Sequence, residues 1–348
     1  MRGVNIRRRA GSRIRRIALL TLAVVLPVGT ALGTAAPASA AYDPAGVDVW
    51  VDSPMGPIKS RVFRAADGNT DRVVYALDGM RAREDLSGWE LHTEVPRQLA
   101  AANINVVLPI GGQSSFYADW AAPSSLAGLP PASGSAGSAT GSGGLQALDP
   151  GPGKSYRYQW ETFLTGALPE ALRDRYGFAT ARNGVIGLSM GASAALALAA
   201  FHPERYSYAA AYSGMLNVNA PGMREAIRLA MVDAGGYNIE SMAPAASALW
   251  QRLDPFSFAP LLRENGTRLW IAAADGRPVP ADGADFDTLN AIALENLAAA
   301  NTRAFQGRLD AVGVTNVTYD FANVGVHTWR NWESEVGRML PDLAAGIG

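Results

Sequence analysis

The chain carries three short runs of β-branched and aromatic residues soon after residue 40. They cover residues 47–51, 58–63 and 72–77, are rich in Val, Ile and Tyr, and are separated by Gly, Pro and Asp. Runs of this length and composition, bounded by turn-forming residues, predict β-strands. We expect these opening strands to form an antiparallel edge of a sheet.

From residue 100 onwards, strand-like runs alternate with stretches that have the length and apolar spacing of helices. Predicted strands cover residues 104–110, 184–188, 206–212, 268–273 and 314–321, and predicted helices cover residues 160–176, about 190–202, 286–312 and 329–345. Helices placed between strands predict a mainly parallel sheet that is covered by helices on both faces. The predicted fold class is therefore α/β, in one domain over residues 41–348.

Two segments depart from this alternation. Residues 122–154 include a run of Gly and Ser with almost nothing to bury, which predicts a solvated loop insertion. Residues 220–236 carry apolar side chains at helical spacing, among them Met223, Ile227 and Leu229. Such a set usually belongs to the core and less often forms a wall for a fatty acyl chain.

The first forty residues predict a secretory signal peptide. Seven arginines precede an apolar run over residues 17–28, and Ala38-Ser39-Ala40 supplies a cleavage site of small residues. A membrane anchor is the weaker interpretation, because the run is short for a spanning helix and is broken by Pro27 and Gly29. We expect a secreted mature chain that begins near residue 41, and export by the general or the twin-arginine route stays open.

Composition excludes several classes of protein. Removal of the seven leader arginines changes the formal net charge from −1 to −8, which makes nucleic acid an unsuitable partner. The chain has no cysteine, so a thiol nucleophile, thiolate metal sites and disulfides are all excluded.

The strongest chemical signal is Gly187-Leu188-Ser189-Met190-Gly191, which stands between a predicted strand and an alanine-rich predicted helix. A serine in this strand–turn–helix context, with small residues two before and two after it, is typical of a nucleophile elbow. The bare pattern is weak in a glycine-rich chain, and an ordinary turn is the alternative. The context favours a serine acyl-transfer enzyme.

A serine nucleophile needs a histidine base that is oriented by a carboxylate. The chain has three histidines. His92 precedes the serine, against the usual chain order of α/β hydrolases, and His202 lies at the far end of the helix that begins at Ser189. His327 remains as the predicted base. For the acid, position after a late strand slightly favours Asp275 over Glu295.

The oxyanion hole is expected to use the backbone N–H of Met190 and a second N–H from the loop over residues 77–82. At this loop a family resemblance becomes specific. The chain contains, in order, the strings LDGMRA at 77–82, GGQSSFYADW at 111–120, WETFL at 160–164, GLSM at 187–190, DAGGY at 233–237, LEN at 294–296 and HTW at 327–329. In these strings the chain resembles the secreted actinobacterial mycolyltransferases of the antigen 85 group.

The resemblance implies an α/β-hydrolase fold and residue roles that follow the matched strings. It makes Ser189 the nucleophile, Glu295 the acid in place of Asp275, and His327 the base. It assigns the oxyanion N–H groups to Met80 and Met190. It also implies sugar contacts by four further residues: Asp78, Arg81, Asn217 and Trp329.

The same resemblance implies the substrates. It predicts transfer of mycolyl groups from trehalose monomycolate to a second such molecule or to cell-wall arabinogalactan, without metal or organic cofactor. We expect a secreted monomer associated with the cell envelope. Adhesion to host matrix proteins, linked in the family to the stretch matched by residues 115–120, is not expected, because packing explains these aromatic residues adequately.

Two alternatives stay open at this level. A secreted carboxylesterase would use the same residues but pass the acyl group to water. A non-catalytic carbohydrate-binding or adhesion protein is the other alternative, because the family includes members without the serine. Retention of Ser189, Glu295 and His327 in one chain argues against the second alternative.

Overall fold

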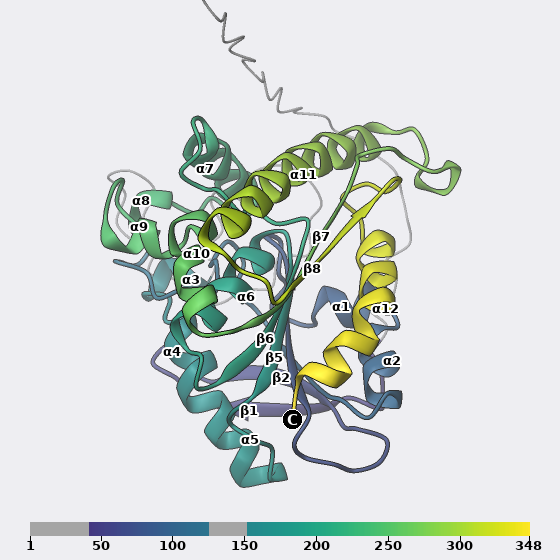
Figure 1. The fold of residues 1–348 in the computed structure, drawn as a ribbon. Helices are drawn as coiled ribbons and strands as arrows, with labels where there is room; N and C mark the ends of the chain where they lie inside the picture. Colours follow the sequence, from purple (N-terminus) through teal and green to yellow (C-terminus); the bar gives the residue numbers. More distant parts are fainter. Residues whose placement is uncertain (1–41, 125–151) are drawn as a thin grey trace, which may run out of the picture.

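The computed structural model describes residues 42–124 and 152–348, and one eight-stranded sheet runs through this part of the chain (Figure 1). The strand order is β1-β2-β4-β3-β5-β6-β7-β8. The strands are β1 (Val47–Val51), β2 (Ile58–Phe63), β3 (Val73–Leu77), β4 (Asn105–Pro109), β5 (Asn183–Leu188), β6 (Tyr206–Tyr212), β7 (Arg268–Ala274) and β8 (Val317–Ala322). The predicted signal peptide and most of the predicted Gly/Ser-rich loop lie outside the described residues.

The sheet is parallel from β4 to β8, and only its first two strands run antiparallel to their neighbours. All residues of β3 and β5 are buried, as expected for strands that are covered on both faces. The predicted mainly parallel α/β architecture is therefore confirmed. The predicted antiparallel edge is correct for the first two opening strands and wrong for the third, because β3 lies between β4 and β5 and is parallel to both. Because β3, β5, β6, β7 and β8 are neighbours, the loops after them meet at one edge of the sheet.

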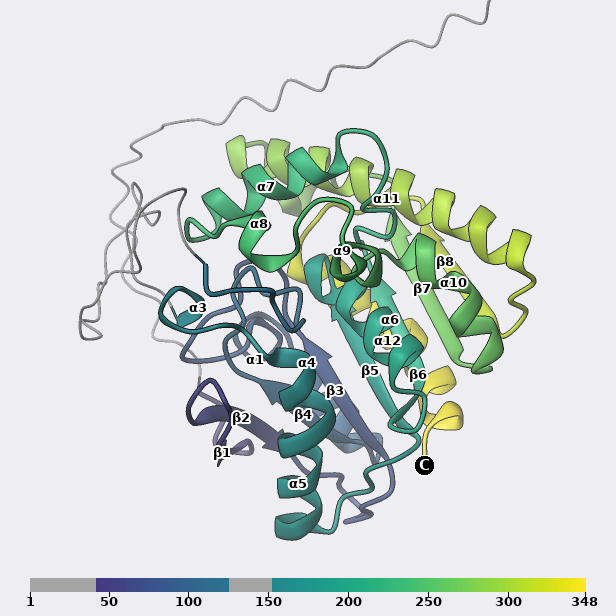
Figure 2. The same ribbon diagram turned by 90° about the vertical axis from the view of Figure 1, so that its left-hand side faces the viewer.

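Helices cover both faces of the sheet (Figures 1 and 2). One layer consists of α1 (Gly88–His92), α2 (Val95–Ala101) and α12 (Trp329–Gly346). The other layer includes α3 (Pro152–Ser155), α4 (Trp160–Thr162), α5 (Leu168–Tyr176), α6 (Met190–Phe201), α8 (Ile239–Met242), α9 (Ala248–Arg252) and α10 (Pro255–Glu264). The remaining helices, α7 (Met223–Asp233) and α11 (Phe286–Val312), lie side by side, as Figure 2 shows, and α11 packs on β7.

Helix α6 lies against the centre of the sheet, where it contacts both β5 and β6. Ten of its residues are buried, and five of these are alanines, so the helix can approach the strands closely. This contact fixes the direction of the helix that begins directly after Ser189.

The structure corrects two details of the sequence-based prediction. The helix predicted over residues 160–176 contains a π-helical turn at Phe163–Ala167, just before Pro169, which has no N–H to continue the α-helical bonding. In α7, Met223 and Ile227 are buried as predicted, whereas Leu229 is 40% exposed and does not belong to the core.

Candidate active site

Ser189 occupies a sharp turn between β5 and α6. Its backbone has φ 52° and ψ −117°, a conformation that residues other than glycine rarely adopt. A Cβ at Gly187 would overlap the carbonyl oxygen of Gly191, and a Cβ at Gly191 would overlap that of Asp78. The N–H of Ser189 donates to the carbonyl of Tyr212 at 2.9 Å, which ties the turn to the end of β6. These contacts explain why the two glycines are needed, and they give Ser189 the backbone of a nucleophile elbow.

Two backbone donors lie beside this turn. Met190 is the first residue of α6, where helix N–H groups have no intrahelical partner and the helix dipole is positive. A Cβ built at Gly79 would lie 3.5 Å from the Cβ of Ser189, which places the loop after β3 against the elbow. Within the described residues, neither the N–H of Met80 nor that of Met190 donates to a protein group. The pair is suited to stabilise an oxyanion that forms next to Ser189.

Glu295 and His327 are brought together from α11 and from the loop after β8. The His327 Nδ1 atom lies 3.0 Å from Glu295 Oε2. The Glu295 carboxylate is fully buried, and its Oε1 accepts from the hydroxyl of Ser213 at 2.8 Å and from the N–H of Ala274 at 2.7 Å. Hydrogen bonds of this kind stabilise a buried charge. With Nδ1 as the donor to Glu295, the Nε2 of His327 is left free to accept a proton.

Sequence reasoning missed two residues that support this pair. The indole N–H of Trp332 donates to the Ser213 hydroxyl at 3.0 Å, and the indole ring packs edge-to-face against His327, with centroids 4.9 Å apart. Ser213 directly follows β6, the strand next to the nucleophile strand. A serine at the carboxyl end of a neighbouring parallel strand was the signal that could have identified it.

Hydrogen bonds through the end of β6 connect the Ser189 elbow to the His327–Glu295 pair. Tyr212 accepts from the N–H of Ser189, and the next residue, Ser213, donates to Glu295. Within the described residues, the hydroxyl of Ser189 makes no hydrogen bond to His327. Catalytic hydrogen bonds are often long in free enzymes and tighten only when substrate binds.

The other candidates for the acid and the base have different partners. The carboxylate of Asp275 accepts from the backbone N–H of Arg277 at 3.0 Å and pairs with its side chain. His202 lies 2.7 Å from Glu161 at the far end of α6. The geometry therefore favours Glu295 over Asp275 as the partner of His327.

Asp78 and Arg81 lie in the loop after β3 and differ in exposure. Asp78 is 2% exposed, and its carboxylate accepts from the Ser87 hydroxyl and the Gly88 N–H, both at 3.1 Å. Burial raises the pKa of Asp78 to about 7, although these hydrogen bonds oppose the effect. The Arg81 side chain is 64% exposed and pairs with Asp233. Asp78 thus anchors the loop, whereas Arg81 is accessible from solvent.

Asn217 and Trp329 lie on separate elements. The N–H of Asn217 donates to Asn301 Oδ1 at 3.2 Å, which places Asn217 against α11. The ring of Trp329 packs edge-to-face on Trp89 and Trp332 and stacks on His92 at 5.3 Å. Trp329 is therefore held in place beside the His327 loop. Contacts of these two residues with sugar stay a prediction.

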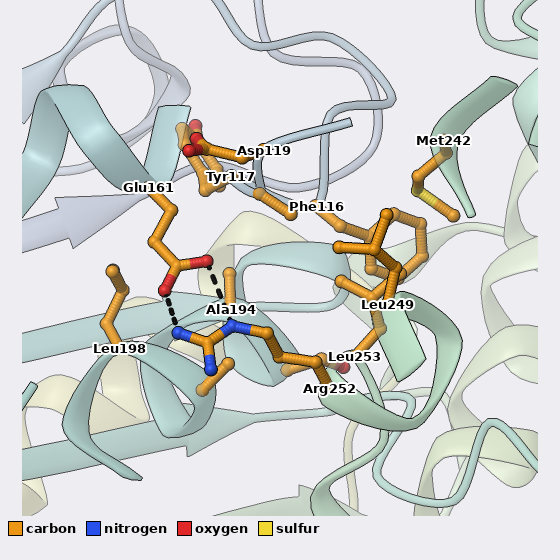
Figure 3. A pocket seen from close by; sticks show the side chains of 13 residues that line it. Phe116, Tyr117, Asp119, Glu161, Ala194, Leu198, Met242, Leu249, Arg252 and Leu253 are labelled. Carbon is orange, nitrogen blue, oxygen red and sulfur yellow. Dashed lines mark hydrogen bonds and ion pairs between the residues drawn. The ribbon is translucent and has the colours of Figure 1, made fainter. Parts of the chain in front are cut away.

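A separate pocket lies along α6, beyond the elbow (Figure 3). Its lining includes Phe116, Ala194 and Leu253, but not Ser189 or His327. Glu161 and Arg252 form an ion pair in it, as Figure 3 shows. Although burial acts in the opposite direction, hydrogen bonds from His202 and Arg252 lower the pKa of Glu161 to about 2. This ion pair joins α4 to α9 and is remote from the serine.

An elbow serine, a histidine–glutamate pair and two nearby N–H donors, on a mainly parallel sheet covered by helices, define a serine-dependent esterase or acyltransferase of the α/β-hydrolase fold. Comparison with known proteins agrees with this class. A family model described as putative esterase matches residues 56–343. An S-formylglutathione hydrolase from Agrobacterium tumefaciens shares the fold, with a TM-score of 0.58 at 16% identity over 87% of this chain and 96% of the other.

Curated relatives identify the group within this class. The chain is 36% identical over 346 residues to the diacylglycerol acyltransferase/mycolyltransferase Ag85B of Mycolicibacterium smegmatis, covering 97% of this chain and 98% of the relative. It is 33% identical over 337 residues to the Ag85C protein of Mycobacterium avium, covering 96% and 88%. Mycobacterium tuberculosis MPT51 (FbpC1) has a TM-score of 0.69 at 29% identity, covering 87% and 99%. The chain therefore belongs to the putative esterase family and, within it, to the antigen 85 diacylglycerol acyltransferases/mycolyltransferases.

Proposed function

We propose that this protein transfers mycolyl groups from trehalose monomycolate to a second trehalose monomycolate or to cell-wall arabinogalactan, through an ester on Ser189. The observation that carries the proposal is the hydrogen bond between His327 and the buried Glu295, in a chain that also retains the serine elbow. Similarity to the named mycolyltransferases supplies the substrate class.

In the first half-reaction Ser189 Oγ attacks the carbonyl carbon of the mycolyl ester. Nε2 of His327 takes the hydroxyl proton, and Glu295 stabilises the imidazolium that results. The carbonyl oxygen becomes an oxyanion, which accepts hydrogen bonds from the N–H groups of Met80 and Met190. Cleavage of the ester C–O bond releases trehalose, which takes the proton from His327, and leaves the mycolyl group on Ser189.

The second half-reaction follows the same path in reverse with a different alcohol. A hydroxyl of the acceptor sugar gives its proton to His327 and attacks the seryl ester. The same two N–H groups stabilise the second oxyanion. Collapse of this intermediate breaks the bond to Ser189 and returns the proton to the serine, so that free enzyme is restored.

The family resemblance assigns sugar contacts to four residues, and we propose that Arg81, Trp329 and Asn217 make them directly. Arg81 and Trp329 suit this role because an accessible guanidinium can donate to hydroxyl groups and a fixed indole can pack against a sugar ring. Arg81 has to exchange its ion pair with Asp233 for such a contact. Asp78, whose carboxylate is occupied by Ser87 and Gly88, acts by holding this loop, and Asn217 is a further contact.

The proposed setting is outside the cell, at the envelope. The predicted signal peptide and the similarity to the antigen 85 group support it. No helix in the described residues combines the length and the apolar character that a membrane span requires.

We propose that the enzyme acts as a monomer, with no cofactor, no nucleic acid partner and no adhesive role. Phe116, Tyr117 and Trp120 are each at most 3% exposed, which agrees with packing as the role of these aromatics.

A product assay with trehalose monomycolate tests this proposal. We expect trehalose dimycolate to accumulate with the native protein and no product with the Ser189→Ala variant. Accumulation of free mycolic acid without dimycolate would indicate a carboxylesterase. Turnover that persists in Ser189→Ala would contradict a seryl ester intermediate.

A further inference from the structure

The loop after β4 is buried and has an uncommon backbone. Within this loop, which we define as residues 111–120, Ser114, Phe116 and Tyr117 have φ angles of 56°, 52° and 46°. All three side chains are at most 3% exposed. Residues other than glycine hold such conformations only where surrounding contacts impose them, and these conformations cluster at functional sites. The contacts of the β4 loop therefore indicate the role of this backbone conformation.

Two of these contacts hold the segment that carries the first proposed oxyanion donor. The N–H of Asp78 donates to the hydroxyl oxygen of Tyr117 at 3.1 Å. The N–H of Ser114 donates to the carbonyl of Met80 at 3.0 Å. Both ends of the stretch from Asp78 to Met80 are thus fixed by one loop. The peptide between Gly79 and Met80, which bears the donor N–H, lies within this stretch.

A third contact reaches the residue that carries the second donor. The N–H of Phe116 points to the sulfur of Met190 at 3.2 Å, and Met190 is fully buried. The Tyr117 hydroxyl also donates to the carbonyl of Gly111 at 3.5 Å, so it bridges the ends of β3 and β4. Burial raises the pKa of Tyr117 well above its usual value, which keeps the hydroxyl protonated and able to donate and accept at once.

We propose that the β4 loop positions the oxyanion hole, and that the Tyr117 hydroxyl is the positioning group that aims the N–H of Met80 at the reacting carbonyl. This inference rests on the proposed function. Tyr117 touches neither the substrate nor the reacting atoms. It acts through the backbone of Asp78 to Met80, so its removal affects the transition state more than the bound ester.

The test compares Tyr117→Phe with Tyr206→Phe. Tyr206 is equally buried, and its hydroxyl donates to the carbonyl of Leu164 at 2.8 Å; within the described residues it makes no hydrogen bond to the loops of the site. Both variants remove one buried hydroxyl and keep the ring, so both should lose thermal stability to a similar extent. A purely structural role for Tyr117 predicts that the two variants also behave alike in catalysis.

The quantities to measure are kcat and KM for p-nitrophenyl butyrate and the inhibition constant of an alkyl boronic acid, which forms a tetrahedral adduct with a reactive serine. Active sites are to be counted by fluorophosphonate titration, so that misfolded protein does not lower the apparent kcat. For Tyr117→Phe we expect kcat to fall about 10- to 100-fold. Loss of one oxyanion donor lowers kcat about 100- to 1,000-fold, and a donor that is displaced but still present retains part of its effect. The boronate affinity should fall by a similar factor, with KM within about twofold of the native value.

Tyr206→Phe should leave kcat and boronate affinity within about twofold of the native values. An active native protein whose Tyr117→Phe variant keeps kcat and boronate affinity would overturn this inference and leave the proposed function intact. The same holds if Tyr206→Phe lowers both quantities as much as Tyr117→Phe does. A native protein that neither hydrolyses the ester nor binds the boronate would overturn the proposed function, and with it this inference.

Discussion

The hydroxyl of Ser213 donates to the carboxylate of Glu295 at 2.8 Å, and the two residues come from the end of β6 and the middle of α11. The same hydroxyl accepts the indole N–H of Trp332. Ser213 thus joins the acid of the proposed triad to the helix that follows His327. A residue in this position should control how well the carboxylate faces the imidazole.

The first prediction concerns Ser213. In Ser213→Ala the Glu295 carboxylate loses one of its three hydrogen bonds, and Trp332 is left with an unpaired N–H. Hydrogen bonds to charged groups contribute about 1.5–3 kcal/mol, so we expect kcat for a p-nitrophenyl ester to fall about 10-fold or more. Thr302→Val, which removes a buried hydroxyl bonded to Ala298 within the same helix α11, is the control and should keep its activity. Equal activity in the two variants would exclude a role for Ser213.

The second prediction separates the two candidate acids. Glu295→Gln should lower kcat about 1,000-fold or more, because the amide no longer stabilises the imidazolium and can select the wrong histidine tautomer. Asp275→Asn should change kcat by less than about threefold, because Asp275 pairs with Arg277 and not with His327. Steady-state kinetics of both variants decide the assignment, and the reverse ranking would make Asp275 the acid.

The third prediction concerns the elbow glycine Gly191. In Gly191→Ala the new methyl group would overlap the carbonyl oxygen of Asp78, so the loop after β3 has to move. We expect a loss of about 2 kcal/mol or more in the free energy of unfolding, together with loss of esterase activity. A methyl group at Gly337 in α12 meets nothing within 4 Å, so Gly337→Ala should instead stabilise the protein by about 1 kcal/mol. Chemical denaturation of both variants is the measurement.

The fourth prediction is a pH dependence of stability that arises from Glu335. This carboxyl group on α12 is 1% exposed, and burial raises its pKa from 4.5 to about 8. The folded state therefore binds this proton more tightly than the unfolded state. The stabilisation is complete below about pH 4.5 and is lost as the pH rises towards 8.

Glu335→Gln removes this dependence, while Arg338 keeps its bond of 2.6 Å to Asp320. Each pKa unit corresponds to about 1.4 kcal/mol, so the variant should gain on the order of 3 kcal/mol over the native protein between pH 5 and pH 8. Glu264→Gln, at the exposed end of α10, is the control and should follow the native curve. Denaturation at several pH values checks this, and parallel curves for native protein and Glu335→Gln would contradict it.

The sequence was sufficient for the parts of the fold in which pattern and burial agree. The predicted bounds of β1 and β2 match the structure, because both runs are rich in β-branched and aromatic residues and are separated by Gly, Pro and Asp. The elbow at Ser189 was predictable because strand, turn and helix signals coincide there. The π-helical turn before Pro169 was missed because the periodicity of the whole segment is helical.

The sequence left open what depends on distant elements. Position in the chain alone slightly favoured Asp275, and it was the family resemblance that indicated Glu295. In the structure α11 packs on β7, and Glu295 of α11 reaches His327. Ser213 and Trp332 are 119 positions apart and meet only in the folded chain. The residue types from Ser114 to Tyr117 do not reveal their positive φ angles, because contacts with neighbouring loops impose this conformation.

The proposed mechanism depends on Ser189 being the activated nucleophile. The most direct measurement is covalent labelling of the protein with a fluorophosphonate, followed by peptide mass spectrometry to locate the adduct. We expect a single adduct on Ser189 in the native protein, none in Ser189→Ala, and slower labelling in Glu295→Gln. No adduct on Ser189 in the native protein, or an unchanged labelling rate in Glu295→Gln, would contradict the proposed triad.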